Sequence, residues 1–261
     1  MKKYSVFTFL ALLAMPGIGN AALRSPSIEN LRIAGMMMYD NDRSVENTGI
    51  YEYSATAPVQ RKLLNSIKRA TVGGDAVVKD GKLYSYNLSI EYGYINSAKY
   101  YVYDIATGES KSTNITYSDV ALAYSHKATS ATIDPQSGMV YCSGLKYDAD
   151  TKTLTPELKT WDLANNTKTT IGAMQAQLCV MSFDKEGNLY GITASSSKGS
   201  EDGGFLVKVD KTTGSLSRIG DTGIRPWFDQ SGVISPYDGK LYWFSNSPAK
   251  SGDANAADAV L

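Results

Sequence analysis

The sequence has little of what most metal sites and catalytic centres use. Among 261 residues it holds one histidine, His126, and two cysteines, Cys142 and Cys179. A metal site built on several histidines is therefore excluded, and a histidine-based triad could use only His126. The sequence also lacks a GxSxG turn, a phosphate-binding loop and a dinucleotide-binding fingerprint. We expect no catalytic residue, no metal and no cofactor from these patterns.

The chain also lacks an excess of charge of either sign, with 26 Lys and Arg against 26 Asp and Glu. No run of basic residues is longer than two, and phosphate backbones bind clustered cations. Beyond residue 21, no apolar stretch approaches the roughly 20 residues that cross a bilayer. The sequence therefore predicts neither a nucleic-acid partner nor a membrane span.

The first 21 residues have the three-part pattern of a secretory signal peptide. A basic start, Met1–Lys3, precedes an uncharged apolar run over residues 4–15, and Gly19-Asn20-Ala21 supplies small residues for cleavage after Ala21. The run is too short for a membrane anchor, and no cysteine near the cleavage site could carry a lipid. We expect a protein that is secreted, periplasmic or on the cell surface.

The rest of the chain is dominated by an internal repeat. Four segments share a Gly, one residue, an apolar residue and then a Tyr, and they are DGKLYSYN at 80–87, SGMVYCSG at 137–144, EGNLYGIT at 186–193 and DGKLYWFS at 238–245. Their tyrosines, Tyr84, Tyr141, Tyr190 and Tyr242, are 57, 49 and 52 residues apart. A packing residue is needed once per repeat, so we expect these rings to lie between repeats. We expect Tyr190→Ala to cost about 3–5 kcal/mol of stability.

A second pattern follows each of the first three segments, and it ends an apolar strand at an aspartate. The three segments are YYVYDIATGES at 100–110, LKTWDLANNTK at 158–168 and FLVKVDKTTGS at 205–215. An Asp before a short turn can accept hydrogen bonds from its own backbone and fix a hairpin. Each unit thus predicts four strands, which for the third unit cover about 177–184, 188–194, 204–210 and 215–220.

This unit resembles the blades of secreted quinoprotein-like and Kelch-like β-propellers over roughly residues 35–261. The resemblance implies an all-β propeller of four-stranded antiparallel blades, a fold that hosts both enzymes and binding modules. The chain departs from both subfamilies, because Trp161 and Trp243 are not in equivalent places and the glycine pairs at 73–74 and 203–204 are out of register.

The blade count is about four to five and is incomplete at both ends. Met36–Tyr39 starts a tyrosine-type strand without an inner strand before it, the segment 49–64 resembles a degenerate copy, and residues 258–261 start an aspartate-type strand. We expect a signal peptide at 1–21, a linker at 22–34 and a repeat domain at 35–261 that is truncated or part of a longer protein.

Cys142 and Cys179 lie in predicted strands among apolar neighbours. In an oxidising compartment they could form a disulfide. The alternative is two buried thiols, which behave as small hydrophobic side chains.

The candidate ligand contacts are loop residues. Arg225, Trp227 and Phe228 lead to the last inner strand, and His126 precedes an earlier one. Aromatic residues and Arg dominate binding hot spots, so we expect these four to face a ligand, against the alternative that the loops pack between blades. Calcium is an unsupported alternative, because the segment from Asp40 lacks the EF-hand Gly and Glu, and the acidic residues of 148–150 and 201–204 suit ordinary turns.

Together these patterns favour a binding or scaffold module for an extracellular glycan, peptide or protein, and they favour a non-enzyme. The alternative is an extracellular propeller enzyme, such as a polysaccharide lyase or a quinoprotein-type oxidoreductase. A convergent set of catalytic side chains at one phase of the repeat would favour the enzyme, and the sequence shows none.

Export gives the first test. We expect N-terminal sequencing of protein from the cell envelope or the medium to begin near Ala22, because the basic start and apolar run direct secretion. Intact Met1 on protein recovered from the soluble cytoplasm would contradict this prediction.

Overall fold

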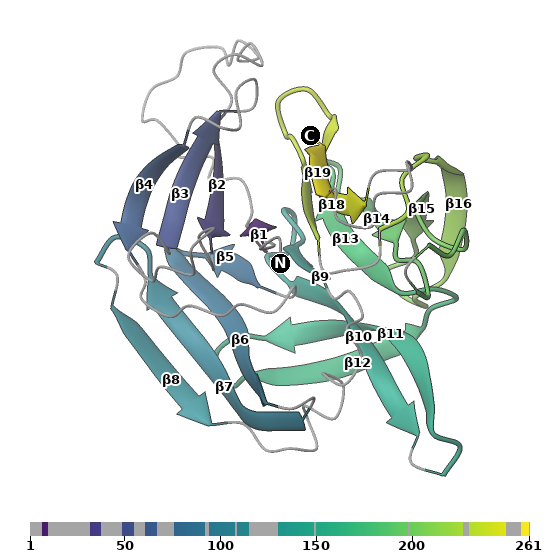
Figure 1. Ribbon diagram of the computed structural model, residues 1–261, viewed down its shortest axis with the longest axis horizontal. Coiled ribbons are helices and arrows are strands. Elements are labelled where there is room, and N and C mark those ends of the chain that lie inside the picture. Colours follow the sequence, from purple (N-terminus) through teal and green to yellow (C-terminus); the bar gives the residue numbers. More distant parts are fainter. Residues whose placement is uncertain are drawn as a thin grey trace.

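The fold is an all-β propeller of five sheets arranged around a centre, as the computed structural model shows (Figure 1). The structure describes residues 7–9, 32–37, 49–54, 61–66, 76–91, 94–107, 109–114, 130–148, 150–197, 199–226, 230–248 and 257–260. We number the sheets as blades 1 to 5 in chain order, and every strand pair in them is antiparallel.

Four blades have four strands and the fifth has three. Blade 1 contains β1 (Phe7–Phe9), β2 (Arg32–Met37), β3 (Gly49–Ser54) and β4 (Arg61–Ser66). Blade 2 contains β5 (Val77–Lys79), β6 (Lys82–Glu91), β7 (Tyr94–Asp104) and β8 (Ser110–Asn114). Blade 3 contains β9 (Ser130–Ile133), β10 (Val140–Asp148), β11 (Thr153–Asp162) and β12 (Thr167–Ala173).

Blade 4 contains β13 (Leu178–Phe183), β14 (Leu189–Thr193), β15 (Phe205–Val209) and β16 (Leu216–Asp221). Blade 5 contains β17 (Ser231–Ile234), β18 (Leu241–Pro248) and β19 (Ala257–Val260). The predicted fold class is therefore confirmed, and so are the four strands predicted for the third unit. The four tyrosine-type segments form β6, β10, β14 and β18, the second strand of successive blades.

Strands lie within the segments predicted as the signal peptide and the linker. β1 lies inside the predicted signal peptide and pairs with β2. Cleavage of that peptide after Ala21 stays a prediction. β2 begins at Arg32, within the segment predicted as a linker. β19 pairs with β18, as expected for the start of an aspartate-type strand. Among the described residues, no helix is long and apolar enough to cross a membrane.

The inner strands are joined across blades by serine hydroxyls. The backbone N–H of Met181 in blade 4 donates to Ser130 Oγ of blade 3 at 2.9 Å. One blade further on, the backbone N–H of Ile234 donates to Ser182 Oγ at 2.8 Å. Ser130 and Ser182 are both buried, so each bond satisfies a backbone donor from within the protein. These bonds fix the height of β13 relative to β9 and of β17 relative to β13.

Apolar clusters fill the spaces between successive blades. The cluster between blades 2 and 3 includes Val77, Tyr84, Tyr100, Val140 and Trp161. A second cluster joins blade 3 to blade 4, where the Tyr141 ring meets the Phe183 ring edge to face at a centroid distance of 5.4 Å. The predicted position of the repeat tyrosines between blades is therefore confirmed for Tyr84 and Tyr141.

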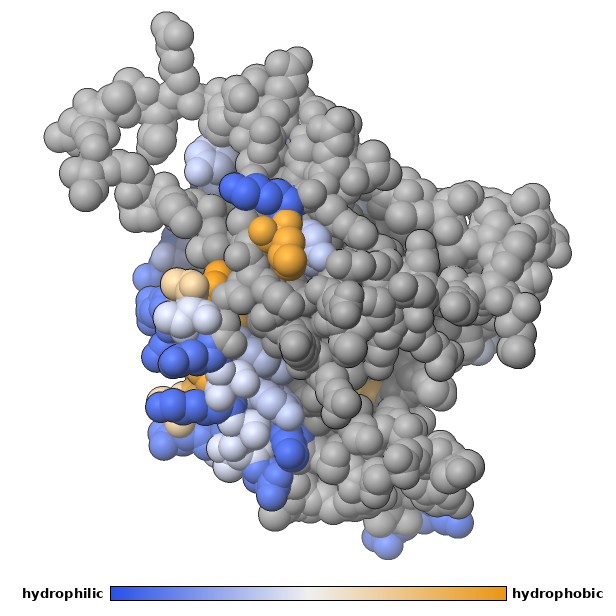
Figure 2. Space-filling view, turned by 60° about the vertical axis from the view of Figure 1, so that its left-hand side comes forward, coloured by the Kyte–Doolittle hydropathy of each residue, from blue (hydrophilic) through white to orange (hydrophobic). Residues whose placement is uncertain are grey.

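The outer surface contrasts with these clusters. All five residues of β8, Ser110–Asn114, are exposed. Figure 2 shows that the described residues on the side of blades 1 and 2 are mainly hydrophilic, with a few hydrophobic side chains between them. In blades 2, 3 and 4 the outer strands β8, β12 and β16 thus turn mainly exposed residues toward solvent.

Cys142 and Cys179 are buried thiols with no bond between them. Cys142 packs in the cluster that faces blade 2, whereas Cys179 packs with Val180 and Ile192 against blade 5. Blades 3 and 4 therefore lie between the two sulfurs. Of the two alternatives that the sequence left open, the structure has the two buried thiols and not the disulfide.

The packing of Tyr141 gives a stability prediction. Tyr141 is buried and Tyr190 only half-buried. The larger loss of stability, which the sequence predicted for Tyr190→Ala, is therefore expected for Tyr141→Ala. We expect Tyr141→Ala to lower the free energy of unfolding by about 3–5 kcal/mol and Tyr190→Ala to lower it by less. Denaturant unfolding measures both, with Tyr141→Phe as the control that keeps the ring. Equal losses for the two alanine variants would show that Tyr141 has no special packing role.

Candidate functional site

The two ends of the propeller are built differently. The turn end carries the connections between the first and second strands and between the third and fourth strands of each blade. The loop end carries the connections between the second and third strands and those between blades. In blade 4 the turn-end connections are residues 184–188 and 210–215, and the loop-end segments include residues 194–204 and 222–226.

Aspartates close the turn end on itself. Oδ1 of Asp104 accepts the backbone N–H groups of Ala106 and Thr107, both at 3.0 Å. Asp162 and Asp210 make the same pair of bonds to residues two and three positions ahead. Hydrogen bonds from the Thr212 side chain and backbone lower the pKa of Asp210, and the sequence prediction of aspartate-fixed hairpins is confirmed.

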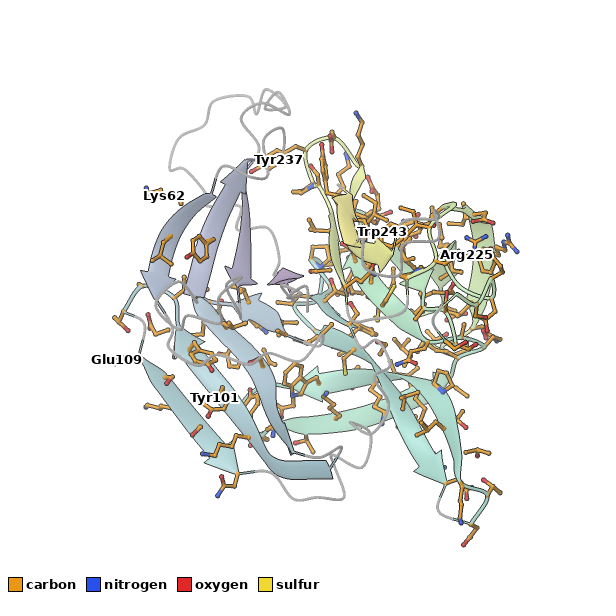
Figure 3. The ribbon with its side chains drawn as sticks, in the orientation of Figure 1. Lys62, Tyr101, Glu109, Arg225, Tyr237 and Trp243 are labelled. Atoms are coloured by element: carbon orange, nitrogen blue, oxygen red, sulfur yellow. The ribbon has the colours of Figure 1, made fainter. Side chains whose placement is uncertain are left out.

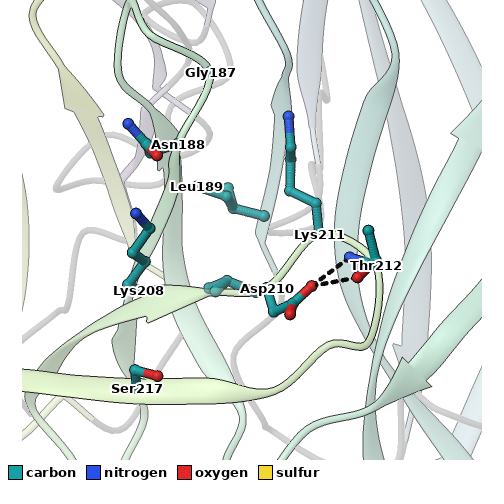
Figure 4. A pocket seen from close by; sticks show the side chains of 9 residues that line it. Gly187, Asn188, Leu189, Lys208, Asp210, Lys211, Thr212 and Ser217 are labelled. Carbon is teal, nitrogen blue, oxygen red and sulfur yellow. Dashed lines mark hydrogen bonds between the residues drawn. The ribbon is translucent and has the colours of Figure 1, made fainter.

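A shallow hollow of about 410 Å³ lies at the turn end of blade 4 (Figure 4). Two of its charged side chains, Asp210 and Lys211, already bind other groups of the protein. Asp210 holds the Thr212 amide and hydroxyl, and Lys211 Nζ lies 3.0 Å from Oδ2 of the buried Asp134. Lys208 is the exposed cation of this hollow. The remaining lining residues are Gly187, Asn188, Leu189, Val209 and Ser217.

The loop end of blade 4 is held by close backbone contacts at two glycines. A Cβ added at Gly204 would collide with the Ile224 carbonyl, and one at Gly203 would collide with the Ser195 backbone. Gly204 also has a φ of +79°, and its N–H donates to the Thr193 carbonyl at 2.7 Å. Only glycine fits this crossing of the two loop segments.

Arg225 ties the same two segments together through carboxylates. Its Nη1 and Nη2 donate to Oδ1 and Oδ2 of Asp221 at 2.8 and 3.0 Å, and its Nε donates to Glu201 Oε2 at 2.7 Å. The guanidinium also lies over the Phe205 ring, 5.5 Å from its centroid. We call this arrangement the Arg225 clamp. Bidentate pairing of this kind fixes geometry as well as charge.

The clamp changes the acidity of Asp221 and Arg225. The hydrogen bonds from Arg225 and the Gly223 backbone lower the pKa of Asp221 to about 2. The hydrogen bonds to Asp221 and Glu201 raise the pKa of Arg225 above its usual value. Both groups therefore stay charged at neutral pH.

A polar cluster extends the loop end beyond the clamp. Asp202 Oδ1 accepts the Ser196 N–H at 2.9 Å and the Ser200 hydroxyl at 2.6 Å. The Ser195 N–H donates to the Pro226 carbonyl at 2.7 Å. The Ser195 hydroxyl is buried and has no hydrogen-bond partner among the described residues. A buried hydroxyl without a partner is uncommon and needs an explanation.

Blade 5 adds an aromatic side chain next to this loop end. Trp243 lies on β18, on the neighbouring blade to Arg225 (Figure 3). Its Nε1–H donates to Oε1 of the buried Gln230 at 2.7 Å, and its ring packs on the cluster that contains Ile192 and Ala194. The Trp243 ring is thereby held in one orientation.

The structure places one of the four predicted ligand contacts. Arg225 lies at the loop end, where most of its donors hold the loops together. Trp227, Phe228 and His126 lie outside the described residues. Sequence reasoning missed Ser195, which carries no local signal of its environment.

Sequence reasoning also missed the two carboxylate partners of Arg225. Asp221 is four residues before Arg225, but no helix makes that spacing a contact, and Glu201 is 24 residues away. The acidic segments weighed for calcium have structural roles here. Glu201 pairs with Arg225, and Asp148 accepts the backbone N–H groups of Asp150 and Thr151. The described residues contain no group of three or more metal-ligating side chains.

Comparison with known proteins gives structural similarity only. No family model and no curated protein matches the chain. An oligogalacturonate lyase in complex with manganese has a TM-score of 0.43 at 8% identity, over 82% of this chain and 58% of that one. The PQQ-bound aldose sugar dehydrogenase from Streptomyces coelicolor has a TM-score of 0.46 at 12% identity, over 88% and 89%.

The β-propeller domain of the Trilobed protease from Pyrococcus furiosus has a TM-score of 0.38 at 12% identity, over 82% of this chain and 59% of that one. The chain thus spans less than two thirds of the lyase and of the protease domain. Such low scores and identities assign neither a family nor an activity.

The clamp predicts a titration that can be measured. We expect Arg225→Gln to raise the pKa of Asp221 from about 2 toward the ordinary value near 3.9, because its largest stabilising partner is removed. Since the pKa is lowered in the folded protein, the contribution of Asp221 to stability is present above about pH 4 and is lost as the pH falls toward about 2.

Carboxyl ¹³C chemical shifts followed by NMR over this range report the titration. Arg218→Gln is the matched control, because Arg218 Nη2 lies 3.8 Å from Asp221 and should change its pKa less. An unaltered Asp221 titration in Arg225→Gln would show that the guanidinium does not hold this carboxylate.

Proposed function

We propose that the protein is an exported binding module that recognises an extracellular glycan, peptide or protein through the loop end of blades 4 and 5. The observation that carries this proposal is the Arg225 clamp. In it, Arg225 pairs with the carboxylates of Asp221 and Glu201, and so holds two segments that are distant in sequence in one arrangement. Ordered long loops on a rigid scaffold are where propellers and other β folds place binding residues.

The difference between the two ends supports the loop end as the binding surface. At the turn end, the aspartate oxygens accept hydrogen bonds from nearby backbone N–H groups, and the hairpins there are short and closed. At the loop end, the buried Ser195 hydroxyl lacks a partner within the described part of the chain. A ligand hydroxyl or carbonyl is one group that could satisfy it.

Within this proposal the predicted contacts divide into two roles. Arg225 positions the loops, because Asp221, Glu201 and the Ile224 carbonyl occupy its donors. Trp227 and Phe228 follow Pro226 in the sequence and supply aromatic surface for direct contact, with His126 as a further polar contact. Aromatic rings stack on sugar faces and pack against peptide side chains alike.

The alternative is a polysaccharide lyase or a quinoprotein-type oxidoreductase. Both reactions need a base that takes a proton from the substrate, and an ionised carboxylate can serve as one. Every resolved pKa shift among the described aspartates is downward, and these residues are Asp104, Asp134, Asp148, Asp162, Asp184, Asp202, Asp210, Asp221 and Asp238. The aspartates are therefore ionised at neutral pH under either proposal, and the loop-end geometry is what supports the binding module.

The test is a binding screen with mapping. Purified polysaccharides and cell-envelope peptides are added to the ¹⁵N-labelled protein, and amide shifts are followed by NMR. We expect the binding partner to move resonances of residues 195–204 and 221–226, and Trp227→Ala and Arg225→Gln to weaken binding at least about tenfold, or roughly 1.4 kcal/mol.

Lys208→Gln in the turn-end hollow is the control and should bind normally. Shifts confined to residues 208–217, binding that survives both loop-end substitutions, or failure of every probe to bind would contradict the proposed function.

A further inference from the structure

Arg218 on β16 is an exposed cation whose guanidinium is held in place by an aromatic ring. Its Cζ lies 3.6 Å from the centroid of the Phe205 ring, a distance that fits a guanidinium plane stacked on the ring. Phe205 itself packs against the apolar cluster between blades 3 and 4, which anchors the ring. The Arg218 side chain is nevertheless 57% exposed. One face of the guanidinium therefore rests on Phe205, while much of the group is open to solvent.

The N–H groups of Arg218 are not used by the fold. Within the part of the chain that the structure describes, Arg218 makes no hydrogen bond. The carboxylate oxygen paired with it, Asp221 Oδ2, is 3.8 Å from Nη2 and already accepts a hydrogen bond from Arg225 Nη2 at 3.0 Å. The guanidinium of Arg218 thus keeps its donors for an acceptor that comes from outside the protein.

Arg225 contacts the same ring but has the opposite role. Its side chain is only 18% exposed, and its donors bind Asp221 and Glu201. This bidentate pairing balances the negative charge of Asp221 at 2.8 Å. Asp221 therefore weakens the attraction of Arg218 for an anion less than an unpaired carboxylate at the same distance would. Arg225 holds the loops, and Arg218 presents its charge to solvent beside them.

The group that fits this guanidinium is a carboxylate. Two parallel N–H donors of an arginine match the two oxygens of a carboxylate in a planar, bidentate pair. Stacking on Phe205 already restricts the Arg218 side chain, so less conformational freedom is lost when the ligand binds.

The neighbouring acceptor indicates what carries the carboxylate. Glu201 is 76% exposed and gives Oε2 to Arg225, while its Oε1 accepts no hydrogen bond among the described residues. The same cluster thus offers a guanidinium for an anion and a carboxylate oxygen for a hydroxyl donor. A uronic-acid sugar carries a carboxylate and several hydroxyl groups on one ring. An acidic peptide side chain carries a carboxylate with no hydroxyl beside it.

We propose that Arg218 binds the carboxylate of a uronic-acid unit in an extracellular glycan, and that Glu201 accepts a hydroxyl of the same glycan. This inference rests on the proposed function, because it names the ligand class of the same loop end. The stacked guanidinium makes the protein select acidic glycans over neutral ones.

Paired ligands test the charge requirement directly. Tetramers of galacturonate, glucuronate and mannuronate are compared by calorimetry with their methyl esters, which keep the sugars and remove the charge. We expect at least one tetramer to bind about tenfold more tightly than its ester, because a charge-assisted bidentate pair is lost on esterification. The same tetramer should shift the Nε–Hε resonance of Arg218 in NMR spectra.

Substitutions assign the difference to Arg218. Arg218→Gln should remove the preference for the acid over the ester, and Arg218→Lys should keep only part of it, because an ammonium has the charge without the planar fork. Lys208→Gln, which removes a different exposed cation of blade 4, is the control and should keep the full preference. Amide spectra of each variant establish that it is folded.

Four outcomes would overturn the inference. They are the failure of every uronate tetramer to bind, equal binding of the esters, a preference that survives Arg218→Gln, and equally tight Arg218-dependent binding of tetraglutamate. If neutral polysaccharides or peptides bind instead, with dependence on Arg225 and Trp227, the proposed function stands and only the uronate assignment is wrong.

Discussion

The serine hydroxyl between inner strands is the contact on which the rest of the propeller depends. Met181 donates its backbone N–H to Ser130, and Ile234 donates to Ser182, so blade 4 takes its position from blade 3 and blade 5 from blade 4. Among the described residues each blade is a separate sheet, and no strand pairs with a strand of another blade. Apolar packing between blades is non-directional and could tolerate a slip along the axis. A directed hydrogen bond at the centre sets the register that the outer contacts then follow.

With the register fixed, the two ends can specialise. Carboxylates at the turn end, such as Asp104 and Asp210, hold only their own hairpins. At the loop end, Asp221 and Glu201 reach a common arginine, so loops from different strands become one surface. The same residue type therefore performs local closure at one end and long-range assembly at the other. The loop end can change its sequence without disturbing the blades, as long as Arg225 and its partners remain.

The sequence contained enough to predict the blades but not the site. A Gly turn before a period-two run located β14 to within a residue or two at each end, because turn and strand chemistry are local. The aspartate hairpins followed from the same local logic. The partners of Arg225 and the burial of the Ser195 hydroxyl depend on how loops cross in space, which no spacing encodes. Tyr190 and Tyr141 look alike in sequence, yet only Tyr141 is buried, because neighbouring blades differ.

The serine contacts also bear on how such a chain could grow. The two bonds span 51 and 52 residues, so donor and acceptor recur at nearly the same interval. A gene duplication of one such interval would add an inner strand that carries both groups. Its serine hydroxyl would accept the backbone N–H of the strand after it, and its own backbone N–H would donate to the serine of the strand before it. An in-frame loss of one interval would rejoin the contacts in the same way. An insertion within a loop leaves both contacts in place, whereas the loss of part of an inner strand would leave a buried amide without an acceptor, so the interval can vary in its loops and not in its inner strand.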